Sequence, residues 1–248
     1  MNEMRQIIAE TDQDTLVQLV VDAFRRTVVH YGHWFAQVEH QLGMEKALAV
    51  ENDVWSASLG NQVQRLGKTL DFPVENGIPA VLNTFSKEAL IDLLEKLGIN
   101  WLANDGIWFQ AVESRFGMND AKRCNDSCWT RYSPFEAERI KKILNLPENG
   151  GIPALQKALA FRMYALINEQ SVEKVDDACI IFRMNKCRVQ AARQRRGLPD
   201  YPCKSVGLVE YPYFASAIDK RIQTECVGCP PDPHPEGWFC AWKFTLAV

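Results

Sequence analysis

Apolar residues recur at helical spacing through the first two-thirds of the chain. The segment 34–42 carries one apolar stripe, made of Trp34, Phe35, Val38 and Leu42. Gly43 follows it, where a glycine commonly ends a helix. A second helix is predicted over 44–70, because Pro73 cannot continue it. A shorter amphipathic helix, at about 15–26, is predicted to precede these two.

The same pattern occurs twice, at a constant offset of 74 residues and without a gap. The matching pairs include Trp34-Phe35 with Trp108-Phe109, Val38-Glu39 with Val112-Glu113, Gly43-Met44 with Gly117-Met118, Trp55 with Trp129, and Gly77–Ala80 with Gly151–Ala154. Tryptophans in register are improbable by chance, so we predict an internal repeat over 34–82 and 108–156. In each copy the Gly-Ile-Pro-Ala motif is predicted to start another helix, since proline is tolerated in a first turn.

After about Asn168 the apolar residues alternate instead, as is typical of strands. Strands are predicted at about 178–189, 221–226 and 238–246, and helices at about 191–196 and 206–218. In the first of these strands one face is expected to carry Ile180, Phe182 and Met184. The sequence therefore predicts an α+β fold. A mostly helical, duplicated region over 1–168 is followed by a smaller antiparallel sheet domain with helices over 169–248.

Composition narrows the function classes. The 248 residues are 47% hydrophobic and 24% charged, which is typical of a globular protein. A net charge of −3 gives no field that attracts nucleic acid. The one basic cluster is interpreted as a solvated helix face: Arg188, Arg193, Arg195 and Arg196. No apolar run reaches the ~20 residues of a membrane span, and the polar, acidic start is unlike a signal peptide. We therefore expect a cytoplasmic protein with reduced thiols and no membrane partner.

Each polar residue of the helical region can be compared with its counterpart in the other copy of the repeat. His33 and His40 have the counterparts Ile107 and Ser114, so these histidines and His30 are interpreted as part of a solvated face. Cys124 and Cys128 replace Val50 and Val54, which favours buried, apolar roles for these thiols.

Glutamates of the repeat give a second, carboxylate candidate. Glu39 and Glu113 occur in both copies, whereas the similarly placed Glu51 has Asn125 as its counterpart. Paired carboxylates between helices can bind metals or act as acid and base. The alternative is that each carboxylate hydrogen-bonds the neighbouring helix.

The C-terminal third is rich in cysteine. Cys226-Val-Gly-Cys229 is a C-x2-C motif that can supply two thiolates to one soft divalent ion. Cys240 on the last strand can supply a third ligand and Cys203 a fourth. Further candidate metal ligands are Cys187, Glu225, Asp232 and His234. Three interpretations stay open: a zinc site, an iron–sulfur cluster suggested by Cys229-Pro230, and free thiols without a metal.

The order of these motifs resembles a known domain type. Cys187, Cys203-x3-Gly207, a helix, Glu225-Cys226 and Cys240-x-Trp-x-Phe244 resemble the 4-vinyl reductase-type small-molecule-binding domain. They also resemble the related L-2-amino-thiazoline-4-carboxylic acid hydrolase family. With WFxxVExxxGMxxA, YPCKSVG and CVGCPPD, the whole chain is similar to an uncharacterised family of bacterial and archaeal cytosolic proteins that pair a helical part with such a domain.

The resemblance implies zinc, bound through cysteines and an acidic residue, in homodimers that sense small aromatic compounds. By position the ligands would be Cys203, Cys226 or Cys229, Cys240 and Glu225. We therefore expect a zinc protein that binds or senses a small molecule in a hydrophobic pocket between its two parts. One alternative is a hydrolase, in which a metal-bound water or a cysteine attacks a small cyclic or amide-like substrate. A second alternative is a thiol redox or iron–sulfur protein.

Overall fold

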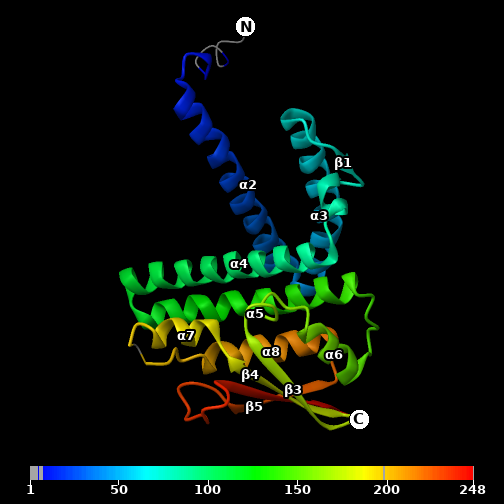
Figure 1. The fold of residues 1–248 in the computed structure, drawn as a ribbon, viewed down its shortest axis with the longest axis vertical. Coiled ribbons are helices and arrows are strands. Elements are labelled where there is room, and N and C mark those ends of the chain that lie inside the picture. Colours follow the sequence, from blue (N-terminus) through cyan, green and yellow to red (C-terminus); the bar gives the residue numbers. More distant parts are fainter. Residues whose placement is uncertain (1–4, 6–7, 198, 248) are drawn as a thin grey trace. The chain divides into compact units, whose positions relative to one another are not determined.

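The structure is a computed structural model that describes residue 5, residues 8–197 and residues 199–247. The chain forms two compact units, Met1–Ala80 and Val81–Val248 (Figure 1). The sequence analysis divided the chain at residue 168 instead. In the structure, the second copy of the repeat belongs to the same compact unit as the cysteine-rich region.

The first unit is a helical hairpin followed by two very short strands. Its elements are α2 (Gln13–Leu42), α3 (Met44–Leu70), β1 (Val74–Glu75) and β2 (Ile78–Pro79). The predicted bounds of α3 are confirmed. The helix expected over 15–26 is not separate but forms the first part of α2, because the helix continues through to the glycine at position 43.

The repeat is visible in the helices of both units. In the second unit, α4 (Lys87–Phe116) begins and ends 74 residues after α2, and α5 (Met118–Ile143) begins 74 residues after α3. Both first helices have a capping side chain, Asp12 or Ser86, that accepts a backbone N–H three residues later. Both end at a glycine with positive φ, +88° at Gly43 and +89° at Gly117. The structural repeat therefore begins about 20 residues before the Trp34 stripe.

The Gly-Ile-Pro-Ala motif folds differently in its two copies. After Gly151 it starts α6 (Gly151–Leu159), as predicted, and this helix buries Ile152, Leu155 and Leu159. After Gly77 the prediction of a helix is wrong, because Ile78–Pro79 form β2, which pairs with β1, and a 3-10 turn η1 (Ala80–Thr84) follows. The backbone N–H of Gly151 donates to the buried Asp219 at 2.9 Å. Contacts with the rest of the fold therefore select the helix in the second copy.

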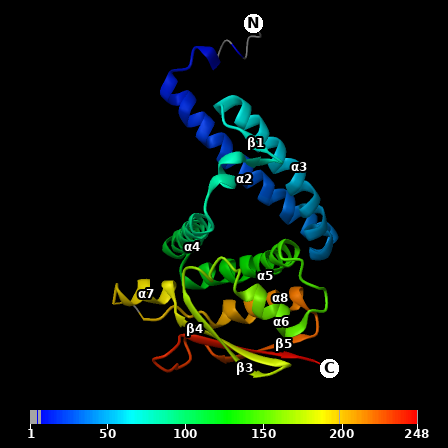
Figure 2. The same ribbon diagram turned by 45° about the vertical axis from the view of Figure 1, so that its right-hand side comes forward.

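The second unit has a layered α+β architecture, so the predicted fold class is confirmed. Its antiparallel sheet has the order β3-β4-β6-β5. The strands are β3 (Glu169–Asp176), β4 (Cys179–Lys186), β5 (Ile222–Gly228) and β6 (Cys240–Leu246). Helix α8 (Lys204–Ile218) and α6 lie on the sheet, and α5 lies on their other side (Figures 1 and 2). The short helix α7 (Arg188–Gln194) follows β4.

The core lies between the sheet and α8. Ile180, Phe182 and Met184 are buried, which confirms the predicted inner face of β4. On β6 the buried residues are Ala241, Trp242 and Phe244, and Phe182 is the direct partner of Trp242. Strand β3 was not predicted, since its mostly polar sequence buries no residue of the strand. Within the described ranges, no helix is long and apolar enough to cross a membrane.

A candidate ligand site lined by thiols

A cavity of about 500 Å³ lies in the second unit, among α4, α5, α7, α8 and the start of β6. Six aromatic residues contribute to its walls: Phe109, Trp129, Tyr164, Tyr201, Tyr211 and Phe239. Four cysteines from four separate segments also line it: Cys187, Cys203, Cys229 and Cys240. The fold therefore gathers half of the chain's eight thiols at one cavity.

The four thiols reach the cavity from the ends of secondary structure elements. Cys187 directly precedes α7, and Cys203 directly precedes α8. Cys240 begins β6 opposite Met184. Cys229 follows β5, and its loop is tied to the start of α8 by two contacts of Lys204. The Lys204 backbone N–H donates to the Pro230 oxygen at 2.8 Å, and its ammonium lies 2.7 Å from Asp232.

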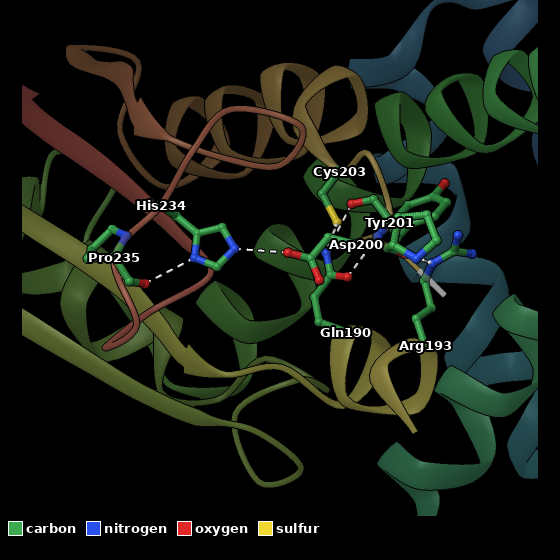
Figure 3. Close-up of polar contacts among 8 residues, drawn as sticks. Gln190, Arg193, Asp200, Tyr201, Cys203, His234 and Pro235 are labelled. Atoms are coloured by element: carbon green, nitrogen blue, oxygen red, sulfur yellow. Dashed lines mark hydrogen bonds and ion pairs between the residues drawn. The ribbon is translucent and has the colours of Figure 1, made fainter. Parts of the chain in front are cut away.

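Side-chain hydrogen bonds hold the segment before α8 in place (Figure 3). Gln190 is buried and donates to the Tyr201 carbonyl oxygen at 3.0 Å, while its own oxygen accepts from the Tyr201 N–H at 2.8 Å. The Gln190 amide nitrogen also lies 3.3 Å from the Cys203 sulfur. Tyr201 and Cys203 are therefore positioned by a single buried amide on α7.

His234 joins two loops rather than facing the cavity. Its Nε2 lies 2.9 Å from Asp200, and its Nδ1 lies 3.0 Å from the Pro235 carbonyl oxygen (Figure 3). These two contacts raise the pKa of His234, since both acceptors favour the protonated ring. Both ring nitrogens are thus engaged with Asp200 and Pro235, and His234 is not among the residues that line the cavity.

Burial favours the protonated thiol at Cys187 and Cys203. It raises the pKa of Cys187 to about 11 and raises that of Cys203 well above its ordinary value. The pKa of Cys229 is raised first by its hydrogen bond with Cys240 and then by burial. Each thiolate would also repel its neighbours, so a bound cation would reverse these shifts.

Three of the four predicted metal ligands line the cavity, and the fourth does not. Cys203, Cys229 and Cys240 are brought to it, whereas Cys226 lies on β5 before a bulge and is not among the lining residues. Cys187, expected only as a further candidate ligand, is there in its place. Glu225 is largely exposed and lies 3.7 Å from Lys243. In the part of the chain that the structure describes, no group of three or more His, Cys, Asp or Glu side chains is arranged to hold a metal ion.

The other candidates from the sequence are dispersed. Glu113 lines the cavity, while its repeat counterpart Glu39 lies in the first unit. Glu51 is buried and accepts from the Tyr31 hydroxyl on the neighbouring helix at 3.0 Å, as the structural alternative predicted. His30, His33 and His40 are exposed on α2, in agreement with a solvated face. The prediction that Cys124 and Cys128 are buried is wrong, because both are exposed on α5.

The basic cluster also differs from its interpretation as a plain solvated face. All four of its arginines line the cavity: Arg188, Arg193, Arg195 and Arg196. Arg193 donates to the Pro199 carbonyl oxygen at 2.7 Å, and the other three are exposed. Because α7 packs beside the cavity, this helix face is both solvated and part of the site.

A buried ion triad at the cavity was not predicted from the sequence. Arg162 Nε lies 2.9 Å from Glu136 Oε2, and its Nη1 lies 2.8 Å from Glu210 Oε1. The side chains of Arg162, Glu136 and Glu210 are only 2%, 5% and 8% exposed. Glu210 lines the cavity, and burial raises its pKa although Arg162 opposes that shift. The three charges are far apart in sequence and follow no motif, so only the fold could reveal them.

Comparison with known proteins gives a family but no activity. A family model described as a family of unknown function (DUF6125) matches residues 9–86 and 83–246. No curated protein matches the chain, and no solved structure matches it either.

Proposed function

The chain belongs to this family of unknown function, and we propose from its own site that the protein binds a small organic molecule in the thiol-lined cavity. The observation that supports this is the convergence of four thiols and six aromatic side chains on one cavity. Its volume of about 500 Å³ is in the range of small-molecule sites, as is its mixture of apolar walls and a few polar groups. A cytoplasmic location is part of the proposal, since it would keep the thiols reduced.

We further propose that the thiols bind a soft divalent metal ion, zinc. The ligands would be Cys187, Cys203, Cys229 and Cys240, because these four line the cavity together. Thiolates suit zinc, and the ion would supply the positive charge that stabilises them against mutual repulsion. Since no ready ligand group exists among the described residues, metal binding would require these side chains to reorient.

The metal part is tested by elemental analysis of protein purified without oxygen. We expect about one equivalent of zinc in the wild type and a loss of metal in Cys203→Ser and Cys240→Ser. Cys124→Ser is the matched control, because Cys124 is exposed on α5 and outside the cavity. Protein without a transition metal would refute the metal part, and a brown protein would indicate an iron–sulfur cluster instead.

Ligand binding is tested by filling the cavity. Gly106 on α4 lines it, and a Cβ added there would meet no atom within 4 Å. Leucine at this position would occupy cavity space, and it would also favour the helix over glycine. Benzyl alcohol, a small neutral aromatic probe, should bind the wild type and not Gly106→Leu. Equal binding to both proteins would locate the ligand elsewhere.

A further inference from the structure

The ion triad leaves an excess of negative charge at the cavity. Two carboxylates, Glu136 and Glu210, share the single guanidinium of Arg162. All three side chains are more than nine-tenths buried, so the second carboxylate is only weakly solvated. The member of the triad that lines the cavity is Glu210.

The two carboxylates differ in the hydrogen bonds that they accept. Glu136 accepts from Arg162 Nε at 2.9 Å through one oxygen and from the Met163 backbone N–H at 2.9 Å through the other. Glu210 Oε1 is within ion-pair distance of Arg162, but among the described residues it has no hydrogen bond of acceptable geometry. Arg162 thus lies equally close to both carboxylates, and its Nη2 and Glu210 Oε1 are both buried without a hydrogen-bond partner among the described residues. Glu210 Oε1 therefore keeps capacity to accept a further hydrogen bond.

Among the residues that the structure describes, Arg162 is the one cation within ion-pair distance of Glu210. Apart from Arg162, the groups whose charges interact with it are acids, thiols and phenols: Glu136, Asp105, Cys187, Cys203, Tyr164 and Tyr211. The four arginines of the cavity belong to the segment 188–196 and do not pair with Glu210. The interior near Glu210 is thus electron-rich, with acid, thiol and aromatic faces.

From this arrangement we infer that the ligand carries a protonated amine or amidinium group, which binds Glu210 inside the cavity. The inference rests on the proposed function, since it assigns the ligand class of the same site. A cationic nitrogen would donate a charge-assisted hydrogen bond to the unsatisfied carboxylate. A neutral or anionic group at this position would leave the excess charge uncompensated.

The test compares three probes of nearly the same shape: benzylamine, neutral benzyl alcohol and anionic benzoate. Ligand-observed NMR titration at pH 7 gives the dissociation constant of each. For the wild type we expect benzylamine to bind about tenfold or more tightly than benzyl alcohol, the size of one charge-assisted hydrogen bond. Benzoate should bind most weakly.

Matched variants test whether Glu210 causes the preference for benzylamine over benzyl alcohol. Glu210→Gln removes the charge and keeps the shape, so benzylamine and benzyl alcohol should then bind within about twofold of each other. Glu236→Gln is the control, because it removes an exposed carboxylate that does not line the cavity and should leave the preference intact. Glu210→Asp keeps the charge and should retain a preference for the amine. This variant serves as the second probe of the site if Glu210→Gln fails to fold.

The outcomes distinguish an error in the ligand class from an error in the binding site. If benzyl alcohol binds as tightly as benzylamine and Gly106→Leu blocks both, the cavity binds ligands but the inference is wrong. Tighter binding of benzoate would also overturn it, because the arginine segment would then set the preference. Loss of metal in Glu210→Gln would assign the carboxylate to the metal and refute its role toward an amine. If no probe binds, both proposals fail.

Discussion

Gly207 on α8 is the position where one added methyl group should most clearly disturb the fold. A Cβ at this residue would lie 2.3 Å from Cζ2 and 2.9 Å from Cη2 of Trp242. Trp242 is fully buried on β6, and its ring stacks on Tyr211 with 4.7 Å between ring centroids. The indole therefore has little room to move, and the substitution Gly207→Ala must push α8 away from the sheet.

The expected magnitude follows from two opposing effects. Overpacking a core costs about 1–3 kcal/mol, and the upper end applies because the obstructing group is a rigid buried ring. Alanine regains about 1 kcal/mol of helix propensity relative to glycine. Gly207→Ala should therefore lower the free energy of unfolding by about 2 kcal/mol. For a unit of this size, that change corresponds to a melting temperature about 4–8 °C lower.

Urea unfolding followed by circular dichroism measures this change. Gly106→Ala is the control, since it also lies within a helix but a Cβ there meets no atom within 4 Å. It should raise the unfolding free energy by about 0.5–1 kcal/mol. The two variants thus differ in sign although the chemical change is the same. A Gly207→Ala protein as stable as the wild type would refute the close approach of α8 to Trp242.

Two further predictions concern buried charges. Arg162→Met leaves two buried carboxylates without a cation, and it should lower the free energy of unfolding by about 3–5 kcal/mol at neutral pH. The control is Arg115→Met at an exposed position, which should change the free energy of unfolding little. A loss under about 1 kcal/mol in urea unfolding would show that the ion triad does not form. The pKa of Asp219 is lowered to about 2, first by its hydrogen bonds with Arg221. The charged carboxylate therefore stabilises the fold fully above the ordinary pKa of 3.8. This stabilisation is lost as the pH falls through about 2. The stability difference between wild type and Asp219→Asn should therefore be constant above about pH 5 and shrink below pH 4, and a difference that grows in acid would contradict the assignment.

The helices of the repeat could be predicted because local signals specify them. Apolar periodicity and the glycines at 43 and 117 fix where α2 and α4 end, and both glycines adopt positive φ. The continuity of α2 was not predicted: the helix expected at about 15–26 and the one that ends at Gly43 are a single helix, which is capped at its start by Asp12. Ser86 caps α4 in the same way and marks the true beginning of the repeat.

The repeat also shows where local sequence stops being sufficient. Trp55 and Trp129 are equivalent by sequence, yet Trp129 is 3% exposed and Trp55 is 41% exposed. Trp129 packs against Tyr132 and Tyr164 in the second unit, and Tyr164 has no counterpart in the matched repeat segments. Two tryptophans at equivalent positions of the repeat therefore differ in burial, because residues outside the repeat pack against only one of them.

By itself, the sequence determined the helix periodicity, the glycines that end α2 and α4, the alternation of β4 and β6, and the cysteine-rich region as the place to seek a site. These features depend on residues close together in the chain. Only the tertiary structure decided that Cys187 rather than Cys226 lines the cavity, that the first Gly-Ile-Pro-Ala motif forms a short strand instead of a helix, and that Glu136, Arg162 and Glu210 form one buried triad. These outcomes depend on contacts between distant segments, because burial and charge pairing are set by which surfaces meet and not by spacing along the chain.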